Sequence, residues 1–500
     1  MDFLKRFTKQ SSPPSNATPD PYADDDVYPV HGLDDTKTFR SIIIAWTLCF
    51  NDVLDADKLQ SSLAKLLENG DWKKLGGRLR LNDKGALEIH VPRQFTSARP
   101  AFSYSHVTIN TSIEEHELAK KLPKANGAIV TCPGPTEFGD LAARADAPMT
   151  LEDLTAGDTP QISVHITSFT DATLVGLSWP HTLMDVMGNQ NLLRAWSLVL
   201  AGKESEVPPV LGAREDALRA LTDNATQPAE EYILKAKQLK GLSMVKFGAR
   251  FAWDMITGPA PKSQTIYLPK DVVAKLRAAT EKDLLMQKND SGLDEKPFIS
   301  DGDVLTAWTL RCIASSLPSP RPLTALHAMN ARFRLPELIN AKGMYMQNML
   351  VPGFIFVSPE MSTGPLGPTA LHNRQSLLEQ ATEGQALASI REQRISGDPS
   401  TLLYSDADAM LVPFTDWSKA KFFSTVDFGA AVVRAGDESE ARSNPTGTPA
   451  FHHCSSRKPN PAARLLVHIL GKDHAGGYWL SLIMSPKAWE NVEESLKELS

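Results

Sequence analysis

The stretch SWPHTLMDVMG, residues 178–188, decides the fold. Before it, apolar and polar residues alternate within 161–179 around a turn at 170–172, which predicts a β-hairpin. After it, apolar residues recur at helical spacing and end at Gly202, a residue that suits a helix C-cap. We therefore expect residues 181–188 in a turn between a buried strand and a helix.

Three side chains of this stretch are candidates for chemistry. His181 emerges rigidly from a buried strand, which suits a general base, and Asp185 can brace the turn or the imidazole ring. The pattern His-x-x-x-Asp is short, so on this pattern alone a histidine that merely caps the strand is an alternative. Ser178 lies on the strand and is a weaker candidate for a nucleophile.

Other segments accompany this turn in a fixed order along the chain. They are Pro160-Gln161, Asp303–Ala307 in a predicted helix, Asn330–Pro336 after a predicted strand, Phe414–Ser418, and Val426–Gly429. In this order and spacing the chain resembles the BAHD superfamily of acyl-CoA-dependent acyltransferases, in particular its fungal branch. The resemblance extends from about Val27 onward.

The resemblance assigns roles to several residues. In that family the histidine of His-x-x-x-Asp is the general base, here His181. The aspartate turns away from the substrate and pairs with the arginine of the Asn-x-Arg segment, so Asp185 and Arg332 are the matching pair, with Arg334 as the second choice. It also implies that Thr415 and Trp417 lie near the acyl site.

The Asp-Phe-Gly segment, with Asp427 and Gly429, is structural in that family and shapes the interface between lobes. The sequence departs from the family pattern at two places. Val186 replaces the glycine that follows the aspartate, and Ala430-Ala431 replaces Trp-Gly after Asp-Phe-Gly.

The resemblance implies an α/β (α+β) fold of two chloramphenicol-acetyltransferase-like lobes. Each lobe is expected to be a mixed β-sheet flanked by helices, with the active site in a tunnel at their interface. We predict a flexible leader at 1–26, an N-terminal lobe at 27–215, a crossover linker at 216–262 and a C-terminal lobe at 263–500. Within the last, we expect one long helix near Ser376 to Gln393 and a Gly/Ser/Pro-rich insertion at 436–462.

Composition narrows the class of partner. The 500 residues carry 52 Lys and Arg against 59 Asp and Glu, a net charge of −7, which argues against nucleic acid or an anionic membrane. The four cysteines are far apart and form no Cys-x-x-Cys pair, as in proteins of a reducing compartment. Neither a signal peptide nor a run of about 18 apolar residues occurs in the sequence, so we expect a cytoplasmic protein.

Other functional patterns receive less support. The sequence has no Gly-x-Ser-x-Gly, phosphate-loop, Gly-x-Gly-x-x-Gly or His-Glu-x-x-His motif. His452-His453-Cys454 has no second ligand pair at suitable spacing, so no metal is predicted. His165 and His327 are expected to be core or tunnel-lining residues. The basic stretch Lys235 to Lys246 is either a solvated helix face or a contact for coenzyme A phosphates.

Together these features predict an acyl-CoA-dependent O-acyltransferase, most simply an acetyltransferase, that acts on a hydroxyl of a specialised metabolite. Acyl-CoA is the expected co-substrate, with no permanently bound cofactor, and the donor and the alcohol react directly in a ternary complex. We expect a monomer. The alternatives are a catalytically silent binding homologue, and an acyltransferase that uses a carrier-protein thioester or an amine acceptor.

Overall fold

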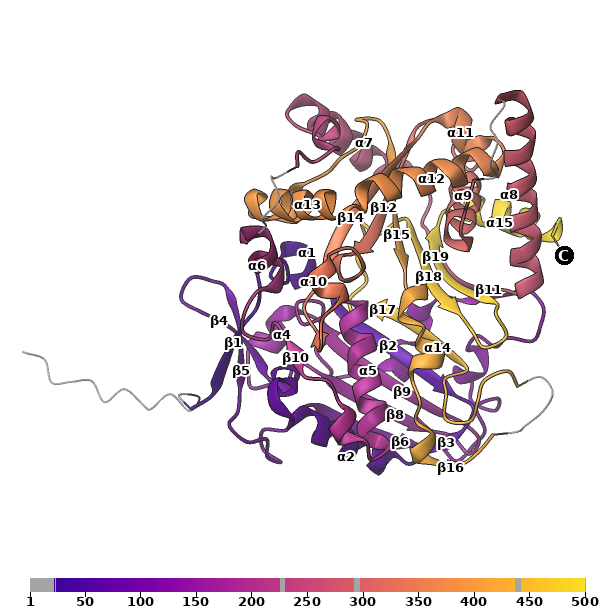
Figure 1. Cartoon of the computed structure of the whole chain (residues 1–500). Helices are drawn as coiled ribbons and strands as arrows, with labels where there is room; N and C mark the ends of the chain where they lie inside the picture. The colour runs from indigo at the N-terminus through magenta and orange to yellow at the C-terminus, as the bar shows by residue number, and fades with distance from the viewer. Residues whose placement is uncertain (1–21, 23, 225–229, 292–296, 437–441, 500) are drawn as a thin grey trace, which may run out of the picture.

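The computed structural model describes residues 22, 24–224, 230–291, 297–436 and 442–499. Two large β-sheets, each flanked by helices, lie one above the other in Figure 1. This is the two-lobed α/β architecture expected from the sequence. Residues 1–21 and 23 of the predicted leader lie outside the described residues, and its last residue, Asp26, is the first residue of strand β1.

The N-terminal lobe is built on a five-stranded sheet with the order β17-β2-β9-β8-β6. Its strands are β2 (Ile43–Phe50), β6 (Ser103–Thr108), β8 (Ser163–Ser168), β9 (Thr173–Pro180) and β17 (Phe451–Ser456). Strands β8 and β9 form the predicted hairpin, in which Ser168 lies opposite Thr173.

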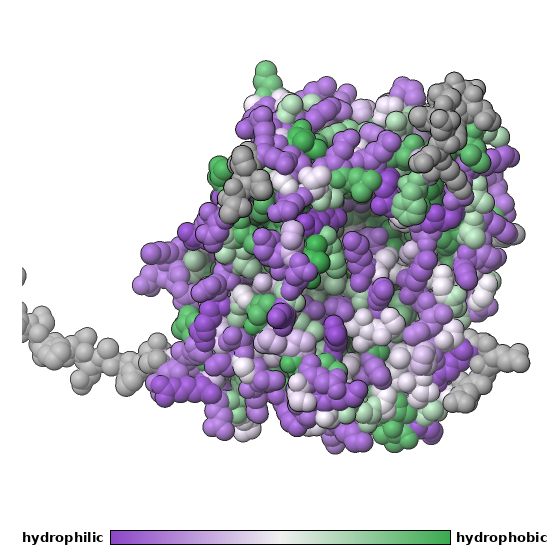
Figure 2. All heavy atoms as spheres, viewed as in Figure 1, coloured by the Kyte–Doolittle hydropathy of each residue, from purple (hydrophilic) through white to green (hydrophobic). Residues whose placement is uncertain are grey.

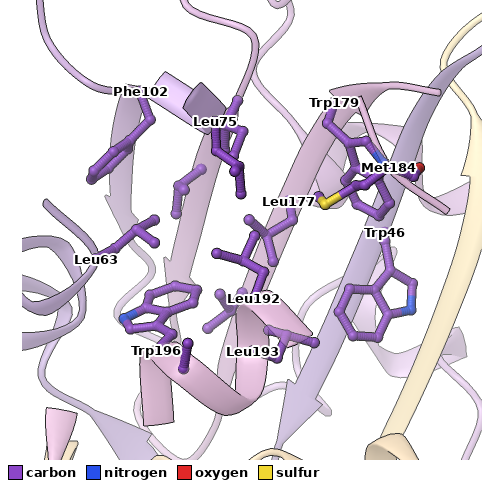
Figure 3. Packing of buried hydrophobic residues seen from close by; sticks show 14 of the residues in the cluster. Trp46, Leu63, Leu75, Phe102, Leu177, Trp179, Met184, Leu192, Leu193 and Trp196 are labelled. Carbon is purple, nitrogen blue, oxygen red and sulfur yellow. Dashed lines mark hydrogen bonds between the residues drawn. The ribbon is translucent and has the colours of Figure 1, made fainter. Parts of the chain in front are cut away.

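Strand β9 is buried along its whole length because both faces of the sheet are covered. Helices α2 (Ala56–Leu67) and α5 (Val186–Leu200) pack on one face, where Trp46, Leu177 and Trp196 belong to a continuous apolar core (Figure 3). On the other face, α3 (Gly139–Ala142) lies so close that a Cβ at Gly176 would collide with the Ala142 backbone.

The C-terminal lobe is built on a seven-stranded sheet with the order β14-β12-β15-β18-β19-β11-β7. Its strands are β7 (Val130–Pro133), β11 (Lys262–Leu268), β12 (Leu323–Asn330), β14 (Leu350–Val357), β15 (Met410–Asp416), β18 (Leu466–Lys472) and β19 (Tyr478–Met484). Because β12, β15 and β18 are parallel, their carboxyl ends share one edge of the sheet.

Helices cover one face of this larger sheet (Figure 1). They are α8 (Lys270–Ser291), α9 (Asp301–Ala314), α11 (Pro359–Thr363), α12 (Leu366–Gln380) and α15 (Pro486–Lys497). Helix α9 begins with a capping box, in which Ser300 and Asp303 exchange hydrogen bonds with each other's backbone N–H.

Smaller elements complete the fold. The short strands are β1 (Asp26–Pro29), β3 (Val53–Leu54), β4 (Arg78–Leu81), β5 (Leu87–Val91), β10 (Val210–Leu211), β13 (Met344–Tyr345) and β16 (Val432–Arg434). The remaining helices are α1 (Lys37–Arg40), α4 (Leu151–Thr155), α6 (Ala217–Asp223), α7 (Leu242–Thr257), α10 (Pro336–Ile339), α13 (Glu383–Ser396) and α14 (Phe422–Thr425). Within the described ranges, no helix is long and apolar enough to cross a membrane.

The two halves of the chain exchange strands. Strand β17, from the second half, pairs with β2 and completes the N-terminal sheet. Strand β7, from the first half, pairs with β11 at the edge of the C-terminal sheet. The predicted lobe boundaries therefore divide the chain but do not divide the two sheets.

Two local expectations were wrong. The segment 436–462, expected as an insertion, contains β17, whose residues His452 and His453 are buried in the N-terminal sheet. The long helix expected from Ser376 to Gln393 is two helices, α12 and α13, because Thr382 caps the second one by accepting a hydrogen bond from the Gln385 N–H.

Candidate active site

The backbone of His181 is held on both sides at the end of β9. Its N–H donates to the carbonyl of Ile42 at 2.9 Å, and its own carbonyl accepts a hydrogen bond of 2.8 Å from Asn348 Nδ2. The imidazole stacks on the Phe39 ring, with a centroid distance of 4.2 Å and an interplanar angle of 8°. Strand pairing and stacking therefore fix the position of this ring.

The surroundings of His181 favour a neutral imidazole. Burial lowers the pKa of His181, while its own backbone, the charge of Asp185 and the side chain of Asn348 raise it. The side chain is half-buried, so substrate can reach it. A neutral, accessible and rigidly held imidazole is able to accept a proton from a hydroxyl.

Asp185 is the N-cap of α5 and is almost fully buried. Its Oδ1 accepts hydrogen bonds from the N–H groups of Met187 and Gly188 at 3.1 and 2.9 Å. Its Oδ2 accepts from Arg332 Nη1 at 2.7 Å, and further bonds come from Asn330 Nδ2 and the Met349 N–H. With both oxygens occupied in this way, the carboxylate braces the turn and is not free to act as a base.

The ion pair between Asp185 and Arg332 is the one expected from the resemblance, and it joins the two lobes. The Arg332 guanidinium also donates to the carbonyls of Tyr345 and Gln347 at 2.9 and 2.6 Å. Arg334, the second choice, donates to the carbonyl of Asn330 and does not contact Asp185.

The helix begins at Val186, three residues before residue 189, where the sequence predicts its start, since Asp185 caps it. Gly188 lies in its first turn, where a Cβ would be 2.5 Å from the Met346 carbonyl oxygen and 2.7 Å from Met184 Cβ. This close approach requires glycine at 188, whereas Val186 is accommodated at the first helical position.

Thr415 and Trp417 lie at the carboxyl end of β15, the edge of the C-terminal sheet that faces the N-terminal lobe. The Trp417 indole packs on His468 at 4.2 Å and on Phe422 at 5.7 Å between ring centroids. Among the described residues, no hydrogen bond or ring contact joins either side chain to His181. Figure 2 shows that the face in view is hollowed between the two lobes.

The Asp-Phe-Gly segment forms a turn that attaches to the N-terminal lobe. Asp427 Oδ1 accepts a hydrogen bond from the Gly429 N–H at 2.9 Å, so its role is local. Phe428 is fully buried and packs between Phe50 of β2 and Trp196 of α5, with centroid distances of 5.4 and 4.8 Å. Ala430 and Ala431 continue as a short 3₁₀ turn.

Comparison with known proteins identifies the family. Residues 147–432 match the model of the Transferase family. The chain belongs to this family. Several curated relatives of this Transferase family member are named acetyltransferases.

Two relatives illustrate the range of names. O-acetyltransferase PaAT-2 of Phomopsis amygdali is 39% identical and covers 95% of this chain and 98% of that protein. A protein of Penicillium decumbens named transcriptional regulator calD is 34% identical and covers 100% of this chain and 99% of that protein. Among solved structures, F. sporotrichioides TRI101 complexed with coenzyme A and T-2 has a TM-score of 0.64 at 14% identity, over 94% of this chain and 97% of that one. This structural likeness shows the fold, and together with the family it makes this chain a BAHD-type acyltransferase.

The other candidate residues of this Transferase family member have structural contacts. His165 Nδ1 is hydrogen-bonded to Ser105, His327 stacks on Phe414, and His452 Nδ1 accepts from the Trp46 indole. In the described part of the chain, no group of three His, Cys, Asp or Glu side chains could hold a metal ion.

The basic stretch Lys235 to Lys246 is paired with acidic residues. Lys235 lies near Glu231, Lys237 near Asp406, and Lys246, on α7, near Asp408. These surface ion pairs fit the solvated-face alternative better than a phosphate site.

Sequence reasoning missed three residues around His181. Phe39 stacks on the imidazole, Asn348 holds the His181 carbonyl, and Asp34 holds Asn348. Asp34 and Asn348 are 314 positions apart. A single sequence carries no local signal that could pair them.

Proposed function

We propose that the chain transfers an acyl group, most simply acetyl, from acyl-CoA to a hydroxyl of a specialised metabolite. The observation that carries this proposal is the placement of His181, whose half-buried imidazole is fixed by Phe39 and kept neutral by burial. Asp185 holds the turn that carries the imidazole.

The reaction needs one proton transfer and one tetrahedral intermediate. His181 removes the hydroxyl proton as the acceptor oxygen attacks the thioester carbonyl, a contribution of about 10²- to 10⁴-fold. The Thr415 hydroxyl and the Trp417 indole N–H are the proposed donors to the oxyanion. When the intermediate collapses, the C–S bond breaks and the coenzyme A thiolate takes the proton back from His181. No covalent acyl-enzyme is required.

The choice of substrates rests on the relatives. TRI101 of the same fold was solved with coenzyme A and with the T-2 mycotoxin, which supports acyl-CoA and a small-molecule acceptor here. A carrier-protein thioester and an amine acceptor are outcomes that a turnover assay would distinguish. We further propose that the protein acts as a monomer in the cytoplasm.

Replacement of His181 by alanine tests the proposal. Thiol release from acetyl-CoA with a panel of alcohols should fall by about 10²-fold or more. His90→Ala is a matched control, because His90 lies on β5, where its partner is Glu88. Circular dichroism checks that both variants fold. Undiminished turnover in His181→Ala would remove the base from the mechanism.

A silent binding homologue is the second candidate, and the name of calD is the observation that favours it. The intact Asp185 and Arg332 pair around an accessible His181 supports catalysis instead. Thiol release above that of heat-denatured protein would decide between the two.

A further inference from the structure

A buried carboxylate lies one side chain away from the proposed base. Asp34 Oδ1 accepts hydrogen bonds from the Asn348 N–H at 2.6 Å and from Asn348 Nδ2 at 2.7 Å. The same Nδ2 donates to the His181 carbonyl at 2.8 Å. Asp34 and Asn348 are 3% and 1% exposed, so neither bond is shared with bulk solvent.

These contacts fix which way the Asn348 amide faces. An ionised carboxylate only accepts hydrogen bonds, so the amide nitrogen must face Asp34. Both protons on Nδ2 are then used, one by Asp34 and one by the His181 carbonyl. Asn348 Oδ1 is enclosed and has no hydrogen-bond partner among the described residues, and the Asn348 side chain raises the pKa of His181.

We propose that Asp34 is a positioning residue for the general base and acts through Asn348. By holding the amide nitrogen, Asp34 directs Asn348 Oδ1 towards the His181 imidazole. An oxygen in that place orients the neutral ring and stabilises the imidazolium that forms when His181 takes the acceptor proton. This inference rests on the proposed function, since it requires His181 to be the base.

The charges around Asp34 are compatible with this role. The pKa of Asp34 is raised to about 7: burial raises it most and Asp216 adds to this, while Lys74 and the Asn348 hydrogen bonds lower it. Lys74 is buried beside it and donates to the Ala213 carbonyl at 3.0 Å. Lys74 therefore favours the ionised carboxylate, which can only accept hydrogen bonds and which prevails above about pH 7.

Two variants and one control test the inference. Asn348→Ala removes the oxygen. Asp34→Asn keeps the shape but can present either an N–H or an oxygen, so the His181 carbonyl remains as the only fixed acceptor for the Asn348 amide nitrogen. Asp35→Asn is the control, since the neighbouring Asp35 pairs with Arg40. Each protein is measured for kcat, for KM of acetyl-CoA, for the pH dependence of kcat/KM and for Tm.

For Asn348→Ala we expect kcat to fall about 10- to 100-fold, the effect of losing one hydrogen bond to a charged group, while KM is nearly unchanged. The acid limb of kcat/KM should move to lower pH, because a group that raises the pKa of His181 is gone. Asp34→Asn should change both quantities in the same direction, and it carries the test if Asn348→Ala does not fold. Asp35→Asn should match the unmodified protein.

A lower Tm with an unshifted acid limb would show a merely structural role and overturn the inference. So would an unchanged kcat in folded Asp34→Asn and Asn348→Ala. If His181→Ala itself keeps full turnover, the acyl transfer stands but His181 is not its base, and the inference falls with that assignment. The proposed function fails only if the unmodified protein releases no thiol from acetyl-CoA, which separates the two failures.

Discussion

Replacing Arg332 by alanine tests whether the ion pair between the lobes holds the catalytic turn. Arg332 Nη1 lies 2.7 Å from Asp185 Oδ2, and the two side chains are 9% and 2% exposed. Removing one partner of a buried pair costs about 3 to 5 kcal/mol, because the other charge stays buried. Asp185 keeps four other donors, from Asn330, Met187, Gly188 and Met349, so we expect the lower end of that range.

The activity should fall more than stability alone explains. The substitution also removes the hydrogen bonds that Arg332 donates to the carbonyls of Tyr345 and Gln347. These two residues flank Met346, whose carbonyl lies against Gly188 in the first turn of α5. His181 lies four residues before Asp185, and a displacement of about 1 Å at a base can cost ~10²-fold in rate. We expect kcat to fall by that order in protein that is still folded at the assay temperature.

Urea unfolding followed by tryptophan fluorescence, together with thiol release from acetyl-CoA, measures both effects. Arg334→Ala is the matched control, because this arginine lies in the same segment but donates to the Asn330 carbonyl. If Arg332→Ala and Arg334→Ala lose equal stability and equal activity, the ion pair does not hold the turn and the reasoning is refuted.

Three further predictions concern other contacts. Phe428→Ala should destabilise the fold by about 3 to 5 kcal/mol in urea unfolding, because the ring is buried; a loss below about 1 kcal/mol would show that the segment is not an anchor. Burial raises the pKa of Asp52, but hydrogen bonds from Arg442 and two backbone N–H groups lower it on balance. The ionised Asp52 therefore stabilises the fold above about pH 4, and this stabilisation is lost as the pH falls further. When Tm is measured against pH, Arg442→Ala should lose less Tm at acid pH than the unmodified protein. If the Thr415 O–H and the Trp417 N–H bind the oxyanion, Thr415→Val and Trp417→Phe should each lower kcat by ~10²-fold with little change in Tm. An unchanged kcat would remove these residues from the site.

The catalytic turn could be predicted because its signals are local. Alternation before residue 180 and helical spacing after residue 188 place His181 between a strand and a helix, where the structure has it. The pairing of Asp185 with Arg332 followed from the resemblance and not from the residues themselves. Asp34, Phe39 and Asn348 could not be predicted, because their contacts with the turn form only when distant segments fold together.

Strand β17 shows why part of the fold escapes sequence reasoning. Its six residues, FHHCSS, contain two histidines and two serines, which do not alternate as a half-buried strand does. Phe451, His452 and His453 are buried because β17 pairs with β2, and His452 is hydrogen-bonded to the Trp46 indole. Tertiary pairing overrides a weak local preference there. The break between α12 and α13 was missed for a related reason, since Ala381 and Thr382 include neither glycine nor proline.

The same long-range pairing explains how one site can depend on two lobes. Strand β17 ties the second half of the chain to the N-terminal sheet, and β7 ties the first half to the C-terminal sheet. At the interface, Asp185 receives hydrogen bonds from Asn330, Arg332 and Met349, all from the second half. Relative motion of the lobes would therefore break buried polar contacts as well as strand pairs, which is costly. Phe39 and Ile42 hold the base from within the N-terminal lobe. The contacts of the second half with Asp185 and with the His181 carbonyl exist only when both lobes are assembled, so the complete site requires that assembly.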